Sequence, residues 1–203
     1  MDETFRPGKA SPTMKLPVLL TVDRRNGSEN LTTDTRSFDE LFLAYWDLIY
    51  GLLLRMIGDP AEAEDLALET FFRLYRNPPK TGRKYNPGGW LFRVATNLGL
   101  HSIRSFQRRQ NYEIIAGKNE LEAASQNRPA QIFEEKEQVL NARSVLSRLD
   151  PRQAKILILR YSGLAYKDIA QILDLSPGSI GPLLLRAERK FEKVYREILK
   201  EEP

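Results

Sequence analysis

The chain has 203 residues but no cysteine and only one histidine, His101. The absence of cysteine excludes disulfides, thiolate metal sites and cysteine nucleophiles. A single histidine argues against a histidine-based metal centre or a catalytic triad. We therefore expect no metal site and no cofactor.

Long apolar runs are also missing. No segment approaches the roughly 20 apolar residues of a membrane span. Residues 1–25 lack the basic start and the long apolar core of a signal peptide. We expect a cytoplasmic protein with no membrane span. Its 41% hydrophobic and 29% charged residues suit one or two small soluble domains.

Charge is distributed unevenly, although the net charge is only +4. Acids dominate residues 37–70, whereas residues 71–112 contain no acid at all. The bases of that second stretch are Arg73, Arg76, Lys80, Arg83, Lys84, Arg93, Arg104, Arg108 and Arg109. Aromatic residues are interleaved with them, which favours a nucleic-acid surface over a merely solvated basic face.

The pattern of apolar residues predicts an all-α fold class. Residues 1–36 have no sustained period and are expected to form a disordered tail. Two later stretches have apolar residues at helical spacing, and neither has the alternating pattern of a strand. We predict two small helical domains, residues 37–112 and 132–200, joined by a flexible polar linker at residues 113–131.

Capping signals mark several helix ends. Ser37, with Glu40 three residues later, forms a capping box before an apolar segment that stops at Gly58. This segment is apolar nearly all round and should be mostly buried. Asp59 and Asp150, each followed by proline, are expected to begin two further helices.

The helix predicted after Asp59 has two contrasting faces at roughly 100° per residue. The expected core face contains Ala63, Leu66, Ala67, Thr70, Phe71 and Leu74. The opposite face contains Asp65, Leu68, Glu69, Phe72, Tyr75 and Arg76. An outward stripe of large apolar groups and carboxylates indicates a protein partner. The alternative is that Leu68 and Phe72 pack on the preceding helix.

A helix is predicted at residues 90–110. Its expected buried face contains Leu91, Val94, Ala95, Leu98 and Ser102. Another sector contains Trp90, Arg93, Asn97, His101, Arg104 and Arg108. Aromatic, amide and guanidinium groups on one stripe are suited to stacking on bases and gripping phosphates. For Trp90 a core position remains an equal alternative.

Residues 164–191 carry a helix-turn-helix pattern. Asp174 occupies a tight turn where a left-handed conformation is tolerated. Ser176 is a good cap for the second helix, with Pro177 behind it. The positions expected to face inward are Ile169, Ala170, Leu173, Ile180, Leu184, Ala187 and Phe191.

Three blocks together resemble a known family. They read "AEDLALETFFRLYR", "WLFRVATNLGLHSIRSFQRR" and "LSRLDPRQAKILILRYSGLAYKDIAQILDLSPGSIGPLLLRAERKF". In order and spacing they are similar to bacterial extracytoplasmic-function sigma factors, over roughly residues 37–195. The resemblance implies an alternative sigma factor rather than an enzyme. Such a protein binds core RNA polymerase, directs it to promoter DNA and assists melting, and an anti-sigma factor is a further expected partner.

The resemblance assigns residues 37–112 to sigma region 2 and residues 132–200 to sigma region 4. The implied polymerase-binding residues are Asp65, Leu68, Glu69, Phe72, Arg73 and Arg76. The implied DNA-binding residues of region 2 are Lys80, Arg83, Lys84, Trp90, Arg93, Asn97, His101, Arg104 and Arg108. Those of the helix-turn-helix are Tyr166, Lys167, Ser176, Gly178, Ser179, Arg186, Arg189 and Lys190.

Two positions depart from the family pattern. His101 stands where an acid is common, and the recognition helix reads "GSIGPLLLRAER". Because proline removes a helical N–H, we expect this helix to start late, with Ser179 as cap, or to bend at Gly181-Pro182. Upstream recognition is then expected to rely on backbone amides, Ser176, Ser179 and DNA shape. Alternatively, the outward leucines serve a protein partner.

Two other functional classes remain as alternatives. A stand-alone helix-turn-helix regulator would use the first domain as a sensor, and the basic aromatic helix argues against that role. An enzyme would need a site such as Asp65 and Glu69, which lie one helical turn apart and could bind a divalent ion. No histidine or further carboxylate converges on that pair in the sequence.

Overall fold

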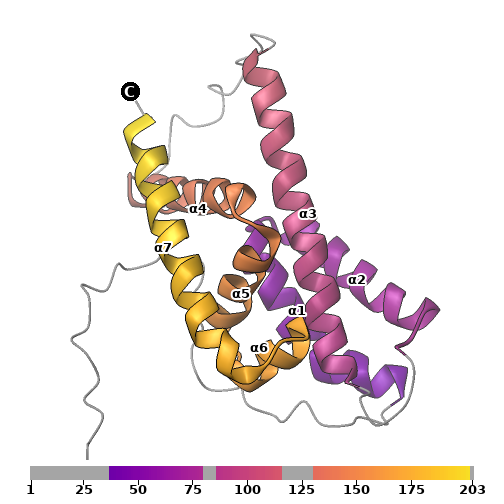
Figure 1. Cartoon of the computed structure of the whole chain (residues 1–203). Helices are drawn as coiled ribbons and strands as arrows, with labels where there is room; N and C mark the ends of the chain where they lie inside the picture. The colour runs from indigo at the N-terminus through magenta and orange to yellow at the C-terminus, as the bar shows by residue number, and fades with distance from the viewer. Residues whose placement is uncertain (1–36, 80–85, 116–129, 202–203) are drawn as a thin grey trace, which may run out of the picture.

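A computed structural model describes residues 37–79, 86–115 and 130–201 (Figure 1). This part of the chain contains seven helices and no strand, which confirms the predicted all-α class. The helices are α1 (Phe38–Ile57), α2 (Pro60–Arg76), α3 (Pro87–Ile115), α4 (Ala130–Arg148), α5 (Pro151–Tyr161), α6 (Tyr166–Leu173) and α7 (Pro177–Glu201). The expected N-terminal tail lies outside the described residues, as do residues 116–129 of the expected linker. Residues 113–115 and 130–131, also expected in the linker, are helical as the ends of α3 and α4.

The predicted helix starts are confirmed by their capping hydrogen bonds. The Ser37 amide donates to Glu40 Oε2 at 2.7 Å, and the Glu40 amide donates to Ser37 Oγ at 3.4 Å, which closes the capping box. The Asp59 and Asp150 carboxylates each accept one amide of the following turn at 2.8 Å. These bonds satisfy donors that the helices leave free at their N-termini.

Helix α1 ends at Gly58, which adopts φ 66°, in the left-handed region. Its amide donates to the Leu54 carbonyl at 2.6 Å. A Cβ at this position would lie 2.2 Å from Arg143 Nη2 of α4. The left-handed backbone conformation therefore favours glycine, whereas the Arg143 guanidinium is the end of a flexible side chain and can move away from a Cβ.

Gly58→Ala should lower the free energy of unfolding by about 1–2 kcal/mol, because alanine is strained in this conformation. Urea denaturation followed by circular dichroism measures this as a lower midpoint at an unchanged slope. Gly178→Ala is the matched control. A Cβ there would meet nothing within 4 Å in a helix, so stability should stay equal or rise by up to about 1 kcal/mol. Equal midpoints for the two variants would contradict this account.

Helices α1, α2 and α3 pack on one another around a core in which Ile49, Leu52, Leu53, Phe71 and Leu91 are 0–2% exposed. The expectation that α1 is mostly buried is wrong on one face. Leu43 is 81% exposed and Leu48 is 39% exposed, because α2 and α3 cover only part of the helix. Apolar residues on every side of this helix therefore predicted more burial than the structure shows.

Helices α4 to α7 form the second group. Asp174 adopts φ 57° and ψ 49° between α6 and α7, as predicted for the tight turn. All the positions predicted to face inward are buried, except Leu173, which is half-buried. Ile172 is buried at 1% exposure and takes the inward position expected for Leu173. The helix-turn-helix is thus held by its predicted apolar contacts.

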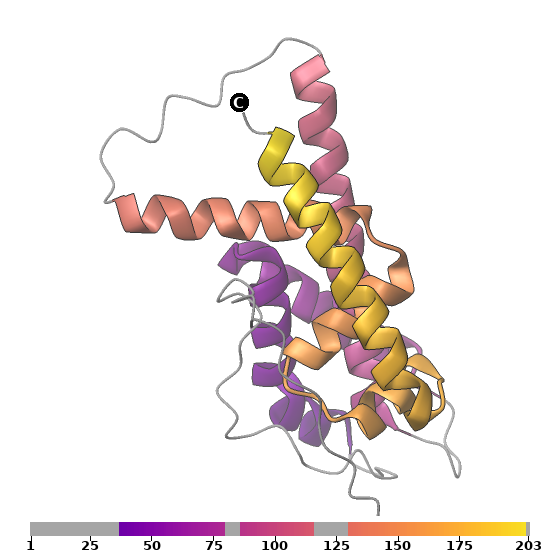
Figure 2. The same cartoon turned by 60° about the vertical axis from the view of Figure 1, so that its left-hand side comes forward.

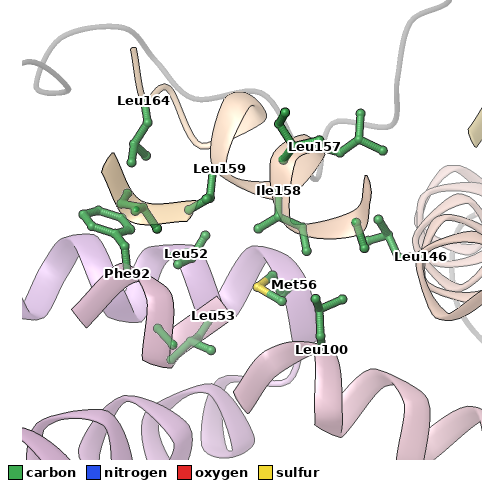
Figure 3. Packing of buried hydrophobic residues seen from close by; sticks show 14 of the residues in the cluster. Leu52, Leu53, Met56, Phe92, Leu100, Leu146, Leu157, Ile158, Leu159 and Leu164 are labelled. Carbon is green, nitrogen blue, oxygen red and sulfur yellow. The ribbon is translucent and has the colours of Figure 1, made fainter. Parts of the chain in front are cut away.

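The two groups of helices lie against each other, and α3 contacts α4, α5 and α6 (Figures 1 and 2). Buried residues of both groups form one cluster (Figure 3). Phe92, Leu100 and Ile103 of α3 are 3–7% exposed, although they lie outside the predicted buried face. Helix α3 is therefore buried on two sides, because its second side packs against the second domain.

Candidate nucleic-acid and protein interfaces

The outward face of α2 is exposed, as predicted. Leu68, Phe72 and Tyr75 are 47%, 51% and 70% exposed, and Asp65 is exposed beside them. The alternative that Leu68 and Phe72 pack on α1 is wrong. The aromatic residues of α1 instead contact Phe71 on the buried face, with ring centroids 4.9 Å away for Phe42. A face with this much unburied apolar surface is suited to a protein partner.

Charged groups are arranged around these apolar side chains. Arg73 Nε donates to Glu69 Oε1 at 2.7 Å, and the Arg76 guanidinium lies 5.6 Å from the centroid of the Phe72 ring. The Glu69 carboxylate is thus paired with Arg73, whereas the enzyme alternative would need it to share a divalent ion with Asp65. Among the described residues, no group of three or more histidine, aspartate or glutamate side chains could hold a metal ion.

Helix α3 begins three residues earlier than predicted. Asn86 Oδ1 accepts the Gly89 amide at 2.8 Å and so caps the first turn. A Cβ at Gly89 would lie 2.6 Å from Asn86 Nδ2, so glycine allows this cap to close. Asn86 was not among the predicted caps, although asparagine followed by proline is a recognisable start signal.

The predicted stripe on α3 is divided by the second domain. Asn97, His101 and Arg108 are exposed, whereas Trp90 is half-buried against the core cluster. The core alternative for Trp90 therefore holds in part, and its role in stacking on a base stays a prediction. The predicted cations Lys80, Arg83 and Lys84 lie outside the described residues.

Two arginines of the stripe bind main-chain carbonyls of the second domain. Arg93 Nε donates to the Ile172 carbonyl at 2.6 Å, and its Nη2 donates to the Gln171 carbonyl at 3.4 Å. Arg104 Nη2 donates to the Leu149 carbonyl at 3.1 Å. Nothing in the sequence signals these contacts, because their partners are backbone atoms 45 or more residues away.

The recognition helix α7 begins at Pro177 and contains Pro182 within it. The expectation that it starts late at Ser179 is wrong, and the helix runs continuously past Gly181 (Figure 1). Ser179 Oγ instead donates to the Ser176 carbonyl at 2.7 Å inside the first turn. Burial of Ile180 at 0% and Leu184 at 5% exposure holds this turn in place, and this packing offsets the hydrogen bond that proline removes.

The outward sector of α7 is short of polar side chains, as predicted. Gly178 and Pro182 are exposed, and Leu185 is 48% exposed. A Cβ at Gly181 would lie 3.8 Å from the ring of Tyr166, which in turn has the Arg160 guanidinium 5.1 Å from its centroid. The exposed bases around this sector are Lys167, Arg186, Arg189 and Lys190.

Comparison with known proteins gives consistent results. Residues 41–110 match sigma-70 region 2, and residues 140–191 match sigma-70 region 4. The ECF RNA polymerase sigma factor SigM of Bacillus subtilis is 30% identical over 171 residues, which cover 82% of this chain and 99% of that protein. SigE of Mycolicibacterium smegmatis, also an ECF RNA polymerase sigma factor, is 30% identical over 159 residues, which cover 76% of this chain and 60% of that longer protein.

A solved structure is also similar. It is the co-crystal structure of the sigma factor RpoE in complex with the anti-sigma factor NepR from Bartonella quintana. The match has 22% identity and a TM-score of 0.45, and it covers 82% of this chain and 98% of that one. Within the described ranges, no helix has the length and apolar character needed to cross a membrane.

Proposed function

Because the chain belongs to the ECF sigma factors of RNA polymerase, we propose that α2 binds the core enzyme while α3 and α7 bind the promoter. A sigma factor directs the polymerase and catalyses no reaction itself. The supporting observation is the contrast between two neighbouring helices. The outward face of α2 combines exposed apolar side chains with charges of both signs, whereas the stripe on α3 has only positive charges and carries an aromatic ring.

Residues 37–112 act as region 2 in this proposal, residues 132–200 as region 4, and residues 113–131 connect them. The protein works in the cytoplasm, where the polymerase and the chromosome are found. An anti-sigma factor is a further proposed partner. The exposed apolar groups on α2 and on α7 are surfaces that such a protein would cover.

The proposed role of α3 is to hold the opened promoter strand. Arg93, Arg104 and Arg108 neutralise phosphates, while Asn97 and His101 offer hydrogen bonds to base edges. The exposed side of the Trp90 ring stacks on an unpaired base, an interaction typically worth about 1–3 kcal/mol per base. Lys80, Arg83 and Lys84 precede α3 in the sequence and would add positive charge to this proposed site.

Helix α7 contacts the upstream promoter element mainly through the DNA backbone. Arg186, Arg189 and Lys190 bind phosphates, with Tyr166 and Lys167 of α6 beside them. The first turns present Ser176, Gly178 and Ser179 but no side chain that forms a bidentate pair with a base. We therefore infer that the upstream element is selected by main-chain contacts and DNA shape.

Run-off transcription tests both parts of the proposal. Core polymerase with this chain is given a pool of genomic fragments, and the start sites are sequenced. We expect defined start sites that depend on the chain, a shared downstream element, and only a weak upstream motif. Transcription that is no different without the chain would refute the sigma-factor role. A sharply defined upstream motif that is lost in the Leu185→Ala variant would refute only the inference that bases of the upstream element are weakly read.

A further inference from the structure

We propose that Leu185 of α7 recognises thymine in the upstream promoter element through a contact with the C5-methyl group of that base. The inference rests on the proposed promoter role of α7 and deepens it, because it names one base and the chemical group on it. A single apolar contact gives only a weak preference, in agreement with the weak upstream motif expected above.

Residues 180–185 place an apolar surface on the outward side of α7. They read Ile-Gly-Pro-Leu-Leu-Leu and include no polar side chain. Leu184 is buried at 5% exposure and Leu183 is half-buried, whereas Leu185 is 48% exposed. Of the three consecutive leucines, Leu185 is therefore the one that a partner can contact, with the exposed ring of Pro182 beside it.

Hydrogen-bond donors are scarce on this part of α7. Pro182 has no N–H, and the amides that follow it donate within a continuous helix. Ser179, about one turn before Pro182, donates its hydroxyl proton to the Ser176 carbonyl at 2.7 Å. Around Leu185, α7 therefore offers a base an apolar contact rather than a hydrogen bond.

One apolar group in the major groove of DNA matches such a surface. Every base pair displays hydrogen-bonding groups there, and among the four bases thymine alone adds a methyl group, at C5. An apolar side chain packed on that methyl removes apolar area of both groups from water. The same side chain leaves the polar edges of the other bases without a partner, which costs free energy. Leucine at position 185 therefore favours thymine.

The glycines before Leu185 allow α7 to come close to the bases. Gly178 and Gly181 precede Leu185 by two turns and one turn, so the three residues share one face of the helix. A Cβ at Gly178 would meet nothing within 4 Å, which shows that this face is open. Because neither glycine has a side chain to hold the helix away, the backbone can approach the base edges and bring Leu185 into contact.

Charge favours DNA over a protein as the partner of this face. The exposed bases around it are Lys167, Arg186, Arg189 and Lys190. Their charges are complementary to the phosphates that border a groove. The apolar area is also small, since it consists mainly of Pro182 and one half-exposed leucine, whereas a stable protein interface buries about 800 Å² on each partner. A single apolar side chain between cations fits a groove better than it fits a protein.

The test compares thymine with uracil, which forms the same base pair but lacks the methyl group. A promoter with thymine in its upstream element is chosen from the run-off experiment, and uracil replaces thymine either in that element or between the two promoter elements. Titration of the labelled fragment measures its affinity for the full chain in complex with core polymerase. Uracil in the upstream element should weaken binding about fourfold, the change expected when one carbon group is no longer buried. Uracil between the elements should have no effect.

Variants at position 185 show whether the leucine makes the contact. Leu185→Ala should weaken binding of the thymine fragment about fourfold and leave binding of the uracil fragment unchanged, so that the preference disappears. Leu185→Met keeps an apolar side chain of similar size and should keep the preference. Leu199→Ala is the matched control, because Leu199 is also on α7 and is 47% exposed, and it should keep the preference as well. Circular dichroism verifies the fold of each variant.

Three outcomes would overturn the proposal. The unaltered chain could bind the two fragments equally, or uracil could weaken the unaltered chain and Leu185→Ala to the same extent, which would indicate an effect on DNA shape. Alternatively, Leu185→Ala could keep the preference and bind core polymerase less tightly, which would place a protein against this face. The proposed promoter role of α7 has its own test. If removal of the whole duplex that carries the upstream element leaves affinity unchanged, that role is refuted and this inference with it.

Discussion

Asp65→Arg should weaken binding of the chain to core RNA polymerase by about thirtyfold, a loss of about 2 kcal/mol that is typical of a central interface residue. Asp65 is exposed on the outward face of α2, beside Leu68 and Phe72, which are 47% and 51% exposed. Reversing its charge replaces an attractive group with a repulsive one at the centre of this surface. The fold should be unaffected, because the side chain is exposed.

Affinity for core polymerase is measured by titration of a labelled chain. Glu137→Arg is the control, since it makes the same change of charge at an exposed position of α4. Its affinity should match that of the unaltered chain to within about twofold, because substitutions outside an interface have little effect. Equal affinities for Asp65→Arg and Glu137→Arg would remove α2 from the polymerase interface.

The second large effect is expected at Arg93. In complex with polymerase, Arg93→Ala should reduce formation of the open promoter complex about tenfold to a hundredfold, with binding to core polymerase unchanged. Trp90→Ala should have an effect of similar size, because it removes a stacking platform. Asp65→Arg should instead weaken binding to core polymerase first, and any defect in promoter melting should follow from that loss.

Melting is measured by the permanganate reactivity of unpaired thymines, at polymerase concentrations that saturate each variant. Arg196→Ala, which removes an exposed arginine of α7 paired with Glu192, should melt promoters normally. Normal melting by both Arg93→Ala and Trp90→Ala would exclude α3 from the strand-binding surface.

Local features of this fold could be predicted from the sequence, because their causes lie within a few residues. Ser37, Asp59 and Asp150 cap helices with amides of the next turn, and Asp174 takes the left-handed turn conformation. The outward face of α2 also follows from helical periodicity alone. Each of these depends on neighbours in the sequence, and each is confirmed.

Contacts between the domains could not be predicted in the same way. Phe92 lies on α3 outside the predicted core face, and only the position of α5 and α6 explains its burial. Arg143 lies outside every motif of the sequence, and Lys155 has no role assigned within the third block, yet both sit at the boundary between the domains. Their roles depend on tertiary packing over long separations, which a single sequence does not encode locally.

The recognition helix shows a case where local rules conflict with packing. Pro182 predicted a late start or a bend, since proline in a helix costs about 3 kcal/mol when nothing relieves it. Ile180, Leu184 and Ala187 are buried at 0–5% exposure and hold α7 as one helix from Pro177. Tertiary burial thus outweighed the preference for a late start, whereas a bend at Gly181-Pro182 stays a prediction.

The central claim is that the stripe on α3 holds the opened promoter strand. A photo-crosslinking amino acid at position 90, in the complex of this chain with core polymerase and promoter DNA, tests it most directly. The account predicts a crosslink to the non-template strand within the melted segment, and none before melting. A crosslink to protein alone, or only to double-stranded DNA upstream, would contradict it.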